Sequence, residues 1–314
     1  MMKEKGFAHM SEGALVVDVK EDTDTKEIPP CIILKSDGAS LYSTTDLATL
    51  VMRMKENNPD RVIYLADARQ SMHFIQVFRC ARKTGIVPDT TELVHIGFGT
   101  MNGKDGKPFK TRDGGVMRLE YLLKEIDDEM LNKIKENQKE KENLNIDEAE
   151  AEQTAKTVAL AAVKYGDLSN QASKDYIFDI DRFTSFEGNT GPYILYTIVR
   201  IKSILSKYEA KGGDISALKD AIMPAVNAGQ KNLMLSLAKF NATIESAYEE
   251  SAPHKICAYI YELANAFNGF YHDTKILSEE NEELKKSYIS LLVLTKEILE
   301  ACIDMLGFSA PDRM

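Results

Sequence analysis

The sequence has 314 residues, of which 44% are hydrophobic and 28% are charged. These fractions are ordinary for globular proteins, so they exclude a mainly disordered or fibrous chain, and the length allows two domains with a core each. The formal net charge of −10 does not indicate a nucleic-acid-binding protein, because binding to phosphates requires an excess of Lys and Arg. Any contact with RNA must therefore use local basic areas.

Targeting and metal signals are missing from the sequence. No run of about 18 apolar residues occurs, and Met1–Lys5 is not followed by the apolar core of a signal peptide. We therefore expect a soluble, cytoplasmic protein with no membrane partner. The four cysteines are Cys31, Cys80, Cys257 and Cys302. They have no CxxC spacing, so we expect neither a metal site nor a disulfide framework.

The N-terminal region begins with a predicted hairpin. Ala14–Val19 combines apolar residues with Asp18, Cys31–Leu34 is apolar, and the polar segment Glu21–Pro30 joins them. Next, Thr44-Thr45-Asp46 has the composition of a helix N-cap before an amphipathic helix over Leu47–Lys55. Taken alone, Asp46 is therefore interpreted as a capping residue.

The following segments alternate between strand and helix patterns. Arg61–Leu65 is a short apolar strand candidate, Phe74–Arg82 a helix candidate, and Glu92–Phe98 a second strand candidate. This order is typical of a parallel α/β sheet. The fold class expected for the first part of the chain is therefore α/β.

The pattern changes after the segment 99–115, which holds five glycines among many charges and is expected to be a mobile surface loop. From Leu119 onward nearly all of the chain is predicted to be helical, including the charged stretch Lys133–Glu142, a solvated helix face or a linker. An all-α domain is expected to start near Gly188–Pro192. Its last helix has an apolar stripe at three- and four-residue spacing, formed by Leu291, Leu294, Ile298, Cys302 and Met305.

Chemistry is most strongly indicated in the loop. Residues 103–112 carry four positive charges and one negative charge, and such a loop can stabilise the charge of a polyphosphate. It is not a Walker A loop, because Gly103-Lys104 is followed by Asp105, and Gly106-Lys107 by Pro108. A solvated basic loop and a phosphate-handling loop both remain open at this point.

The segment GKDGKPFKTRDGG at 103–115 resembles the degenerate KMSKS motif of bacterial arginyl-tRNA synthetases, with Lys107-Pro108-Phe109-Lys110-Thr111 in place of Lys-Met-Ser-Lys-Ser. The resemblance extends over most of the chain, in the same order as in that family. It is carried by LYSTTDLA (41–48), DARQSMHF (67–74), AAVKYGDLS (161–169), DYIFDID (175–181), FEGNTGPYILYT (186–197) and PDRM (311–314).

This resemblance implies roles for two lysines of the loop. Lys107 and Lys110 would bind the phosphates of ATP and stabilise the pentacoordinate transition state as the carboxylate of arginine attacks the α-phosphorus. Pro108-Phe109 departs from Met-Ser, as is usual in this subfamily. Mg²⁺ would accompany ATP as part of the substrate, and no prosthetic group is expected.

The resemblance also implies an arginine pocket formed by Tyr42, Asp46 and Gln70. A carboxylate can accept two parallel hydrogen bonds from a guanidinium, which lysine cannot imitate. Gln70 follows a predicted strand, where α/β folds place ligands, although it could also simply start a helix. His73 is placed beside the ATP site, with packing against Phe74 as its alternative role.

One tempting match is rejected. His95-Ile96-Gly97-Phe98 is similar to the HIGH signature of class I synthetases, but that motif opens a helix well upstream of the KMSKS loop. Here the segment ends a predicted strand only a few residues before the loop. No HIGH motif is therefore expected in the 314 residues.

The helical domain resembles the DALR anticodon-binding domain of class I synthetases. Its aromatic side chains could stack on splayed RNA bases, as recognition of single-stranded loops requires. Core packing is the expected role for most of them, and none is assigned to a base. The aromatic residues in question are Tyr259, Tyr261, Phe267, Phe270 and Tyr271.

The sequence thus predicts the C-terminal part of a Rossmann-type class I synthetase catalytic domain over 1–187, including the loop and a helical connector, and a helical-bundle anticodon-binding domain over 188–314. The expected function is arginine–tRNA ligation with ATP, arginine and tRNA(Arg), performed together with an upstream HIGH-containing segment and not by this chain alone. The alternatives are a non-catalytic tRNA-binding module and one half of a split synthetase. An incomplete sheet would also favour self-association.

Overall fold

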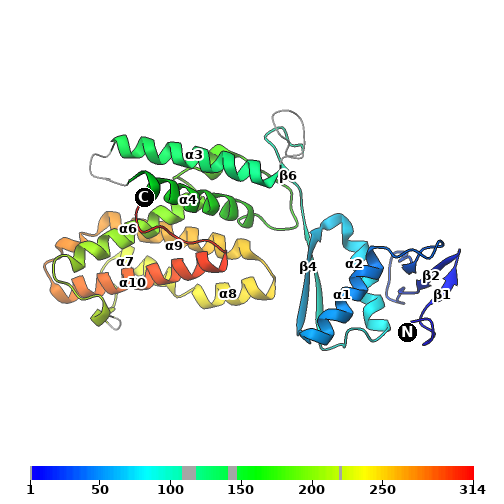
Figure 1. The fold of residues 1–314 in the computed structure, drawn as a ribbon. Helices are drawn as coiled ribbons and strands as arrows, with labels where there is room; N and C mark the ends of the chain where they lie inside the picture. The colour runs from blue at the N-terminus through cyan, green and yellow to red at the C-terminus, as the bar shows by residue number, and fades with distance from the viewer. Residues whose placement is uncertain (1, 108–117, 141–146, 219–220) are drawn as a thin grey trace. The chain divides into compact units, whose positions relative to one another are not determined.

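A computed structural model of the chain describes residues 2–107, 118–140, 147–218 and 221–314 (Figure 1). The chain forms two compact units. The N-terminal unit comprises Met1–Thr100 with Ser173–Asp175, and the helical unit comprises Met101–Ala172 with Tyr176–Met314. Each unit has a hydrophobic core of its own.

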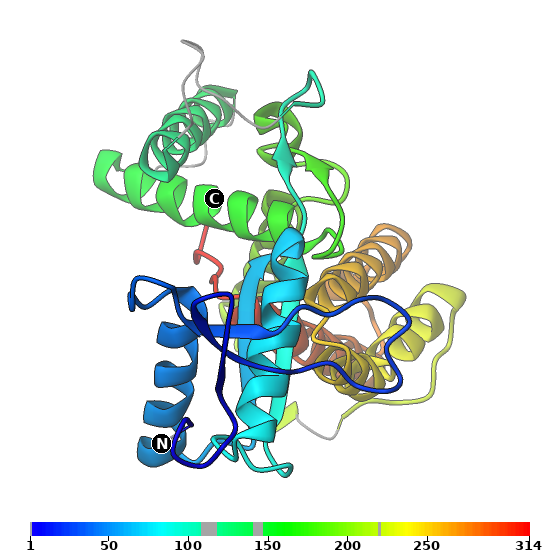
Figure 2. The same ribbon diagram turned by 90° about the vertical axis from the view of Figure 1, so that its right-hand side faces the viewer.

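The N-terminal unit has three layers, which Figure 1 shows next to one another. An antiparallel sheet of order β1-β2-β3 forms one layer, and a parallel pair, β4-β5, forms the opposite layer. Helices α1 and α2 lie side by side between them (Figure 2). The elements are β1 His9–Ser11, β2 Ala14–Val17, β3 Cys31–Leu34, α1 Tyr42–Glu56, β4 Arg61–Asp67, η1 Ala68–Gln70, α2 Ser71–Lys83 and β5 Glu92–Phe98.

The predicted hairpin is confirmed, because β2 pairs antiparallel with β3. The parallel α/β pattern is confirmed as well, because β4 and β5 pair in parallel from Arg61↔Glu92 to Asp67↔Phe98. The short strand β1, which no sequence pattern indicated, adds a third strand to the antiparallel sheet.

The start of α1 corrects the sequence interpretation of Asp46. The helix begins at Tyr42, so Asp46 lies inside it and is not its N-cap. The hydroxyls of Ser43 and Thr44 donate to the carbonyls of Ile32 and Ile33 in β3, and the backbone N–H of Leu41 donates to Thr44 Oγ1. These contacts join the first turn of α1 to the sheet and leave the Asp46 carboxylate free for other partners.

The two faces of the β4-β5 pair differ in burial. Val62 and Tyr64 point toward the helices, where Val62 is buried and the ring of Tyr64 lies 5.0 Å from that of Phe74. Ile63 and Leu65 point to the opposite face, where Leu65 is 70% exposed. Parallel sheets are normally covered on both faces, so this apolar face is unusual.

The helical unit contains seven longer helices among the described residues, with short elements between them. α3 packs on α4, α4 on α6, and α9 on α7 and α8. The elements are β6 Met101–Asn102, α3 Leu119–Glu140, α4 Glu148–Leu168, β7 Tyr176–Ile177, α5 Ile180–Phe183, α6 Gly191–Glu209, η2 Ser216–Leu218, α7 Ala228–Leu237, α8 Phe240–Glu249, α9 Pro253–Asp273, η3 Ile276–Ser278 and α10 Glu282–Met305.

Part of the segment 99–115 is a strand, which differs from the expected mobile loop. β6 pairs in parallel with β7, and the N–H of Phe178 donates to the carbonyl of Asn102. A turn follows, in which the N–H of Gly103 donates to the carbonyl of Lys107. The polar composition gave no sign of this pairing, because its partner strand lies about 75 residues later in the chain.

Two glycines let α4, α5 and α6 approach each other closely. A Cβ on Gly191 at the start of α6 would lie 2.3 Å from the carbonyl oxygen of Ala161 in α4. A Cβ on Gly166 in α4 would lie 2.3 Å from the ring of Phe183 in α5. Any larger side chain at either position would push these elements apart.

The apolar stripe predicted for the last helix is only partly right. Leu291 and Cys302 are buried in α10, as predicted, whereas Met305 is 50% exposed. The buried face continues instead through Leu299 and Ile303. Within the described parts of the chain, no helix combines the length and the apolar content needed to cross a membrane.

Candidate functional site

The predicted arginine pocket lies in the N-terminal unit, near the starts of α1 and α2. His73 Nε2 lies 2.6 Å from Asp46 Oδ2, so the two residues are directly hydrogen-bonded although 27 positions separate them. Both side chains are partly buried. The ring of His73 also makes an edge contact with Phe74, with 5.1 Å between ring centroids. His73 therefore packs against Phe74, as its alternative role required, and also faces a carboxylate.

Tyr42 and Gln70 present free side chains near this pair. Tyr42 opens α1, one helical turn before Asp46, and it is 83% exposed. Gln70 is the exposed last residue of η1 and the N-cap residue of α2, without a side-chain capping bond. Neither side chain has a hydrogen-bond partner among the described residues. Both side chains are therefore available to a ligand. No contact among the described residues joins Tyr42 to Gln70.

The carboxyl end of β4 carries a second acidic group that the sequence interpretation did not single out. Asp67 accepts a hydrogen bond from the N–H of Arg69 at 2.8 Å, and Arg69 also forms an ion pair with it. Arg69 lowers the pKa of Asp67 to about 2. Asp67 thus stabilises the turn that contains Gln70, and the negative charge of Asp67 is balanced by Arg69.

His95, rejected above as part of a HIGH motif, is a packed residue of β5. Its ring stacks on Phe74 with 4.4 Å between centroids. Its Nε2 is buried and has no hydrogen-bond partner among the described residues. His95 therefore supports the aromatic layer beneath His73, because Phe74 contacts both rings.

The base of the basic loop is fixed within the helical unit. Lys104 Nζ lies 3.0 Å from Asp179 Oδ1 and 2.9 Å from Asp181 Oδ2. Asp181 and then Asp179 raise the pKa of Lys104, and Lys104 lowers the pKa of Asp181. Lys107 is exposed, and its N–H donates to Asp105. Lys110 lies outside the described residues.

A polar and aromatic network joins α6 and α9 in the helical unit. Arg200 donates to Asn268 Oδ1 at 2.6 Å, and its guanidinium lies over the rings of Tyr196 at 4.7 Å and Tyr271 at 5.4 Å. Asn268 also donates to the hydroxyl of Tyr193. Sequence reasoning missed the α6 residues, although their spacing of three and four positions is a detectable signal.

The aromatic residues of α9 divide between the core and this network. Tyr259, Phe267 and Phe270 are buried in the core, in line with the packing role expected for most of them. Tyr261 is partly buried and contacts Tyr193, and Tyr271 is exposed. Within the described ranges, no three His, Cys, Asp or Glu side chains are placed to hold a metal ion together.

Comparison with known proteins defines the class. Residues 1–180 match the family described as "tRNA synthetases class I (R), catalytic domain", and residues 194–314 match the "DALR anticodon binding domain". The chain thus combines part of a class I aminoacyl-tRNA synthetase catalytic domain with a helical anticodon-binding domain. It belongs to the arginyl-tRNA synthetase family.

Individual relatives agree with this assignment. The chain is similar to the arginine–tRNA ligase of Alkaliphilus oremlandii (strain OhILAs), with 54% identity over 313 residues, 100% of this chain and 52% of the relative. It is 43% identical over 310 residues to that of Francisella tularensis subsp. tularensis (strain WY96-3418), covering 98% of this chain and 51% of the relative. The chain therefore spans about half the length of these curated relatives.

Solved structures are similar over the whole chain. The arginyl-tRNA synthetase of Plasmodium falciparum matches with a TM-score of 0.81 and 27% identity, over 100% of this chain and 51% of that one. The arginyl-tRNA synthetase of Thermus thermophilus matches with a TM-score of 0.81 over 100% of this chain and 57% of that one. At 23% identity, the second match supports the fold alone.

Proposed function

We propose that this chain takes part in arginine–tRNA ligation, supplying one wall of the site that activates arginine together with the surface that binds tRNA(Arg). The observation that carries this proposal is the pairing of Asp46 with His73 at the starts of α1 and α2. It places a carboxylate beside an imidazole close to the carboxyl end of β4, the edge at which α/β sheets bind ligands.

Arginine recognition is assigned to Tyr42, Asp46 and Gln70. Asp46 Oδ2 faces His73, and Oδ1 has no partner among the described residues, so the carboxylate can still accept hydrogen bonds from a guanidinium. The exposed residues Tyr42 and Gln70 add a neutral hydroxyl and a neutral amide that can form hydrogen bonds. His73 orients the Asp46 carboxylate and is assigned to ATP binding as well.

ATP binding is assigned to Lys107 and Lys110, with Mg²⁺ bound to the nucleotide. Lys104 already forms ion pairs with two carboxylates. Of the two described lysines in this turn, Lys107 is therefore the one available to bind a phosphate. In the reaction, a carboxylate oxygen of arginine attacks the α-phosphorus of ATP and pyrophosphate leaves. Positive charge near the phosphates stabilises the transition state, and no protein nucleophile is needed.

Binding of tRNA(Arg) is assigned to the helical unit. The network of Arg200, Tyr196 and Tyr271 combines a guanidinium with aromatic faces, and Asn268 adds an amide. Unstacked bases are recognised by this combination of stacking and hydrogen bonding. The exposed part of the network is therefore the candidate surface for anticodon bases.

The test is arginine-dependent and tRNA(Arg)-dependent exchange between ATP and pyrophosphate. We expect no exchange by the 314-residue chain on its own, because its sequence contains no HIGH motif. Exchange by the isolated chain that exceeds that of a Lys110→Ala variant would overturn this expectation. Salt-sensitive binding of tRNA(Arg) is expected in the same preparation.

Two other functions are distinguished by the same measurements. A tRNA-binding module without catalysis would bind tRNA(Arg), lose binding when the anticodon is changed, and show no exchange in any mixture. One half of a split synthetase would regain exchange when a HIGH-containing upstream fragment is added.

A further inference from the structure

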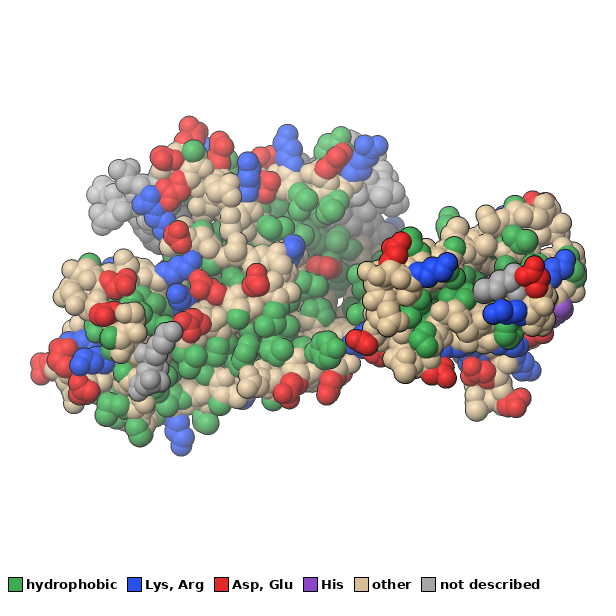
Figure 3. All heavy atoms as spheres, turned by 60° about the horizontal axis from the view of Figure 1, so that its bottom comes forward, with side chains coloured by type: hydrophobic (Ala, Val, Ile, Leu, Met, Phe, Trp, Pro, Cys, Tyr) green, Lys and Arg blue, Asp and Glu red, His purple; other side chains and the backbone are tan. Residues whose placement is uncertain are grey.

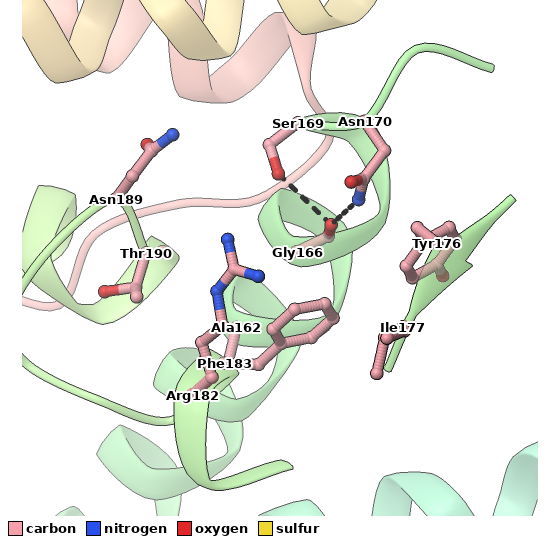
Figure 4. Close-up of a pocket in the computed structure, with 11 residues that line it drawn as sticks. Ala162, Gly166, Ser169, Asn170, Tyr176, Ile177, Arg182, Phe183, Asn189 and Thr190 are labelled. Carbon is pink, nitrogen blue, oxygen red and sulfur yellow. Dashed lines mark hydrogen bonds between the residues drawn. The ribbon is translucent and has the colours of Figure 1, made fainter. Parts of the chain in front are cut away.

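A small polar pocket lies in the helical unit, where the end of α4 meets α5 and the start of α6 (Figure 4). Its volume is about 50 Å³, and none of the described residues that line it is acidic. In Figure 4 the guanidinium of Arg182 extends from α5 into the space bordered by Ser169, Asn189 and Thr190. None of the site residues assigned above lines this pocket.

Arg182 is an exposed residue of α5. Its guanidinium has no hydrogen-bond or ion-pair partner within the described ranges. Two acidic residues near it in the sequence, Asp179 and Asp181, are both paired with Lys104. Asp167 of α4 accepts a hydrogen bond from the hydroxyl of Tyr176 at 2.7 Å. An anion that enters the pocket would therefore meet a free guanidinium and no competing carboxylate in the lining.

Most of the other polar side chains that line the pocket are already hydrogen-bonded within the protein. Asn189 Oδ1 accepts from the hydroxyl of Tyr165 at 2.5 Å, so its amide nitrogen is left as a free donor. Ser169 and Asn170 both donate to the carbonyl of Gly166, which fixes the rim of the pocket. Thr190 Oγ1 already caps α6 by accepting from the N–H of Tyr193. The guanidinium, and not the helix end, is therefore the feature that attracts an anion.

The size of the pocket limits the ligand. A volume of about 50 Å³ holds a few water molecules or one tetrahedral anion, but neither a base nor a nucleotide. The elements around the pocket are closely packed, because Gly166 against Phe183 and Gly191 against Ala161 leave no room for a Cβ. A guanidinium offers paired N–H groups that match two oxygens of a phosphate.

We propose that the Arg182 pocket receives one phosphate group of the tRNA backbone. This rests on the proposed function of the helical unit in binding tRNA(Arg). Because the net charge is −10, phosphates must bind at individual positively charged positions and not to a generally basic surface. On the face shown in Figure 3, the Lys and Arg side chains are scattered among Asp and Glu. A preformed pocket with one unpaired guanidinium is such a position.

The test compares tRNA(Arg) binding by the whole chain and by Arg182→Gln as the NaCl concentration is varied between about 50 and 200 mM. Loss of one phosphate contact lowers the slope of log affinity against log salt by about 0.7 to 0.9. We expect that change, with an affinity loss of about tenfold at the lower salt. Arg182→Lys should restore most of the slope, because it keeps the charge.

Three controls distinguish a specific effect at the pocket from general effects of the substitution. Lys286→Gln removes one positive charge that is already paired with Glu283, and it should leave the slope unchanged. The thermal unfolding of Arg182→Gln should match that of the unmodified chain, because the Arg182 guanidinium has no hydrogen-bond or ion-pair partner within the described structure. Inorganic phosphate, added at constant ionic strength, should compete with tRNA for the unmodified chain but not for Arg182→Gln.

The outcomes are distinct. If the unmodified chain binds tRNA and Arg182→Gln keeps the same slope and affinity, the pocket assignment is wrong while the proposed function stands. If phosphate binds through Arg182 but the tRNA slope does not change, the pocket takes free phosphate and not the tRNA backbone. If the unmodified chain shows no salt-dependent tRNA binding, the proposed role of the helical unit fails, and the pocket assignment fails with it.

Discussion

Asp24 joins the long polar connection between β2 and β3 to the middle helices of the N-terminal unit. Arg79 of α2 donates to both carboxylate oxygens, at 2.7 and 2.8 Å, and the N–H of Glu21 donates to the same group. Arg79 is the main cause that lowers the pKa of Asp24 from 3.8 to about 2, and the Glu21 N–H adds to it. The contact therefore stabilises the fold only while Asp24 is ionised.

The pH dependence of this contact has a definite sign. Because the folded-state pKa is lowered, the stabilisation is complete above about pH 4 and is lost as the pH falls toward 2. We expect Asp24→Asn to lower the melting temperature of the N-terminal unit at pH 7, and this effect to shrink as the pH falls from about 4 through 2. Circular dichroism melts over this range test the prediction, with Asp22→Asn as the control, and a difference that does not change with pH would refute it.

At the candidate site, the sequence suggested individual residues but not their contacts. Asp46, Gln70 and His73 were proposed from resemblance to a family, and they lie near the starts of two neighbouring helices. The bond between Asp46 and His73 could not be predicted, because it depends on how α1 packs beside α2. Arg182 was missed because an unpaired charge is visible only once its neighbours are known.

At the scale of elements, the prediction for the helix α10 had the correct spacing of apolar residues but partly the wrong buried face. The predicted stripe ended at Met305, but Leu306 is the buried residue at that turn. Several neighbouring positions in α10 are apolar, so more than one stripe satisfies the same spacing. Only packing against the rest of the core selects the buried face.

A pair of truncations in α10 tests that face. Leu299→Ala should destabilise the helical unit by about 2 to 5 kcal/mol, because Leu299 is fully buried and its removal leaves a cavity. Met305→Ala should change stability by no more than about 0.5 kcal/mol, because half of its side chain is exposed. Urea denaturation followed by helical signal measures both, and equal losses would show that the buried face is assigned wrongly.

The short strands were the elements that the sequence could not reveal. β1, β6 and β7 have only two or three residues each, which is too short for a period-two pattern to stand out. The longer elements were found because alternation or a three-to-four spacing repeats several times within them. The base of the basic loop is positioned by one of these undetected pairs, β6 with β7.

At the scale of the whole molecule, the β4-β5 pair is an incomplete sheet. Two parallel strands with one apolar face exposed form a smaller sheet than is normally stable, and within the part of the chain that the structure describes each strand has one unpaired edge. Ile63, Leu65 and Phe98 are exposed there. A surface of this kind promotes association.

We therefore expect the isolated chain to self-associate at micromolar concentration, and Leu65→Lys to reduce that association. Met52→Lys is the matched control, because Met52 is also an exposed apolar residue of the N-terminal unit but lies on α1. Sedimentation velocity over a range of concentrations gives the answer. A chain that stays monomeric at every concentration, or a Leu65→Lys variant that associates as strongly as the control, would contradict the prediction.

The most direct measurement of the proposed function is reconstitution of arginine activation. The chain is mixed with the part of the Alkaliphilus oremlandii relative that it does not cover, and exchange between ATP and pyrophosphate is followed with arginine and tRNA(Arg) present. We predict exchange in the mixture, none from either part alone, and its loss in Lys110→Ala and Asp46→Asn. A mixture that forms a complex and binds tRNA(Arg) yet shows no exchange, or exchange that both variants retain, would contradict the account.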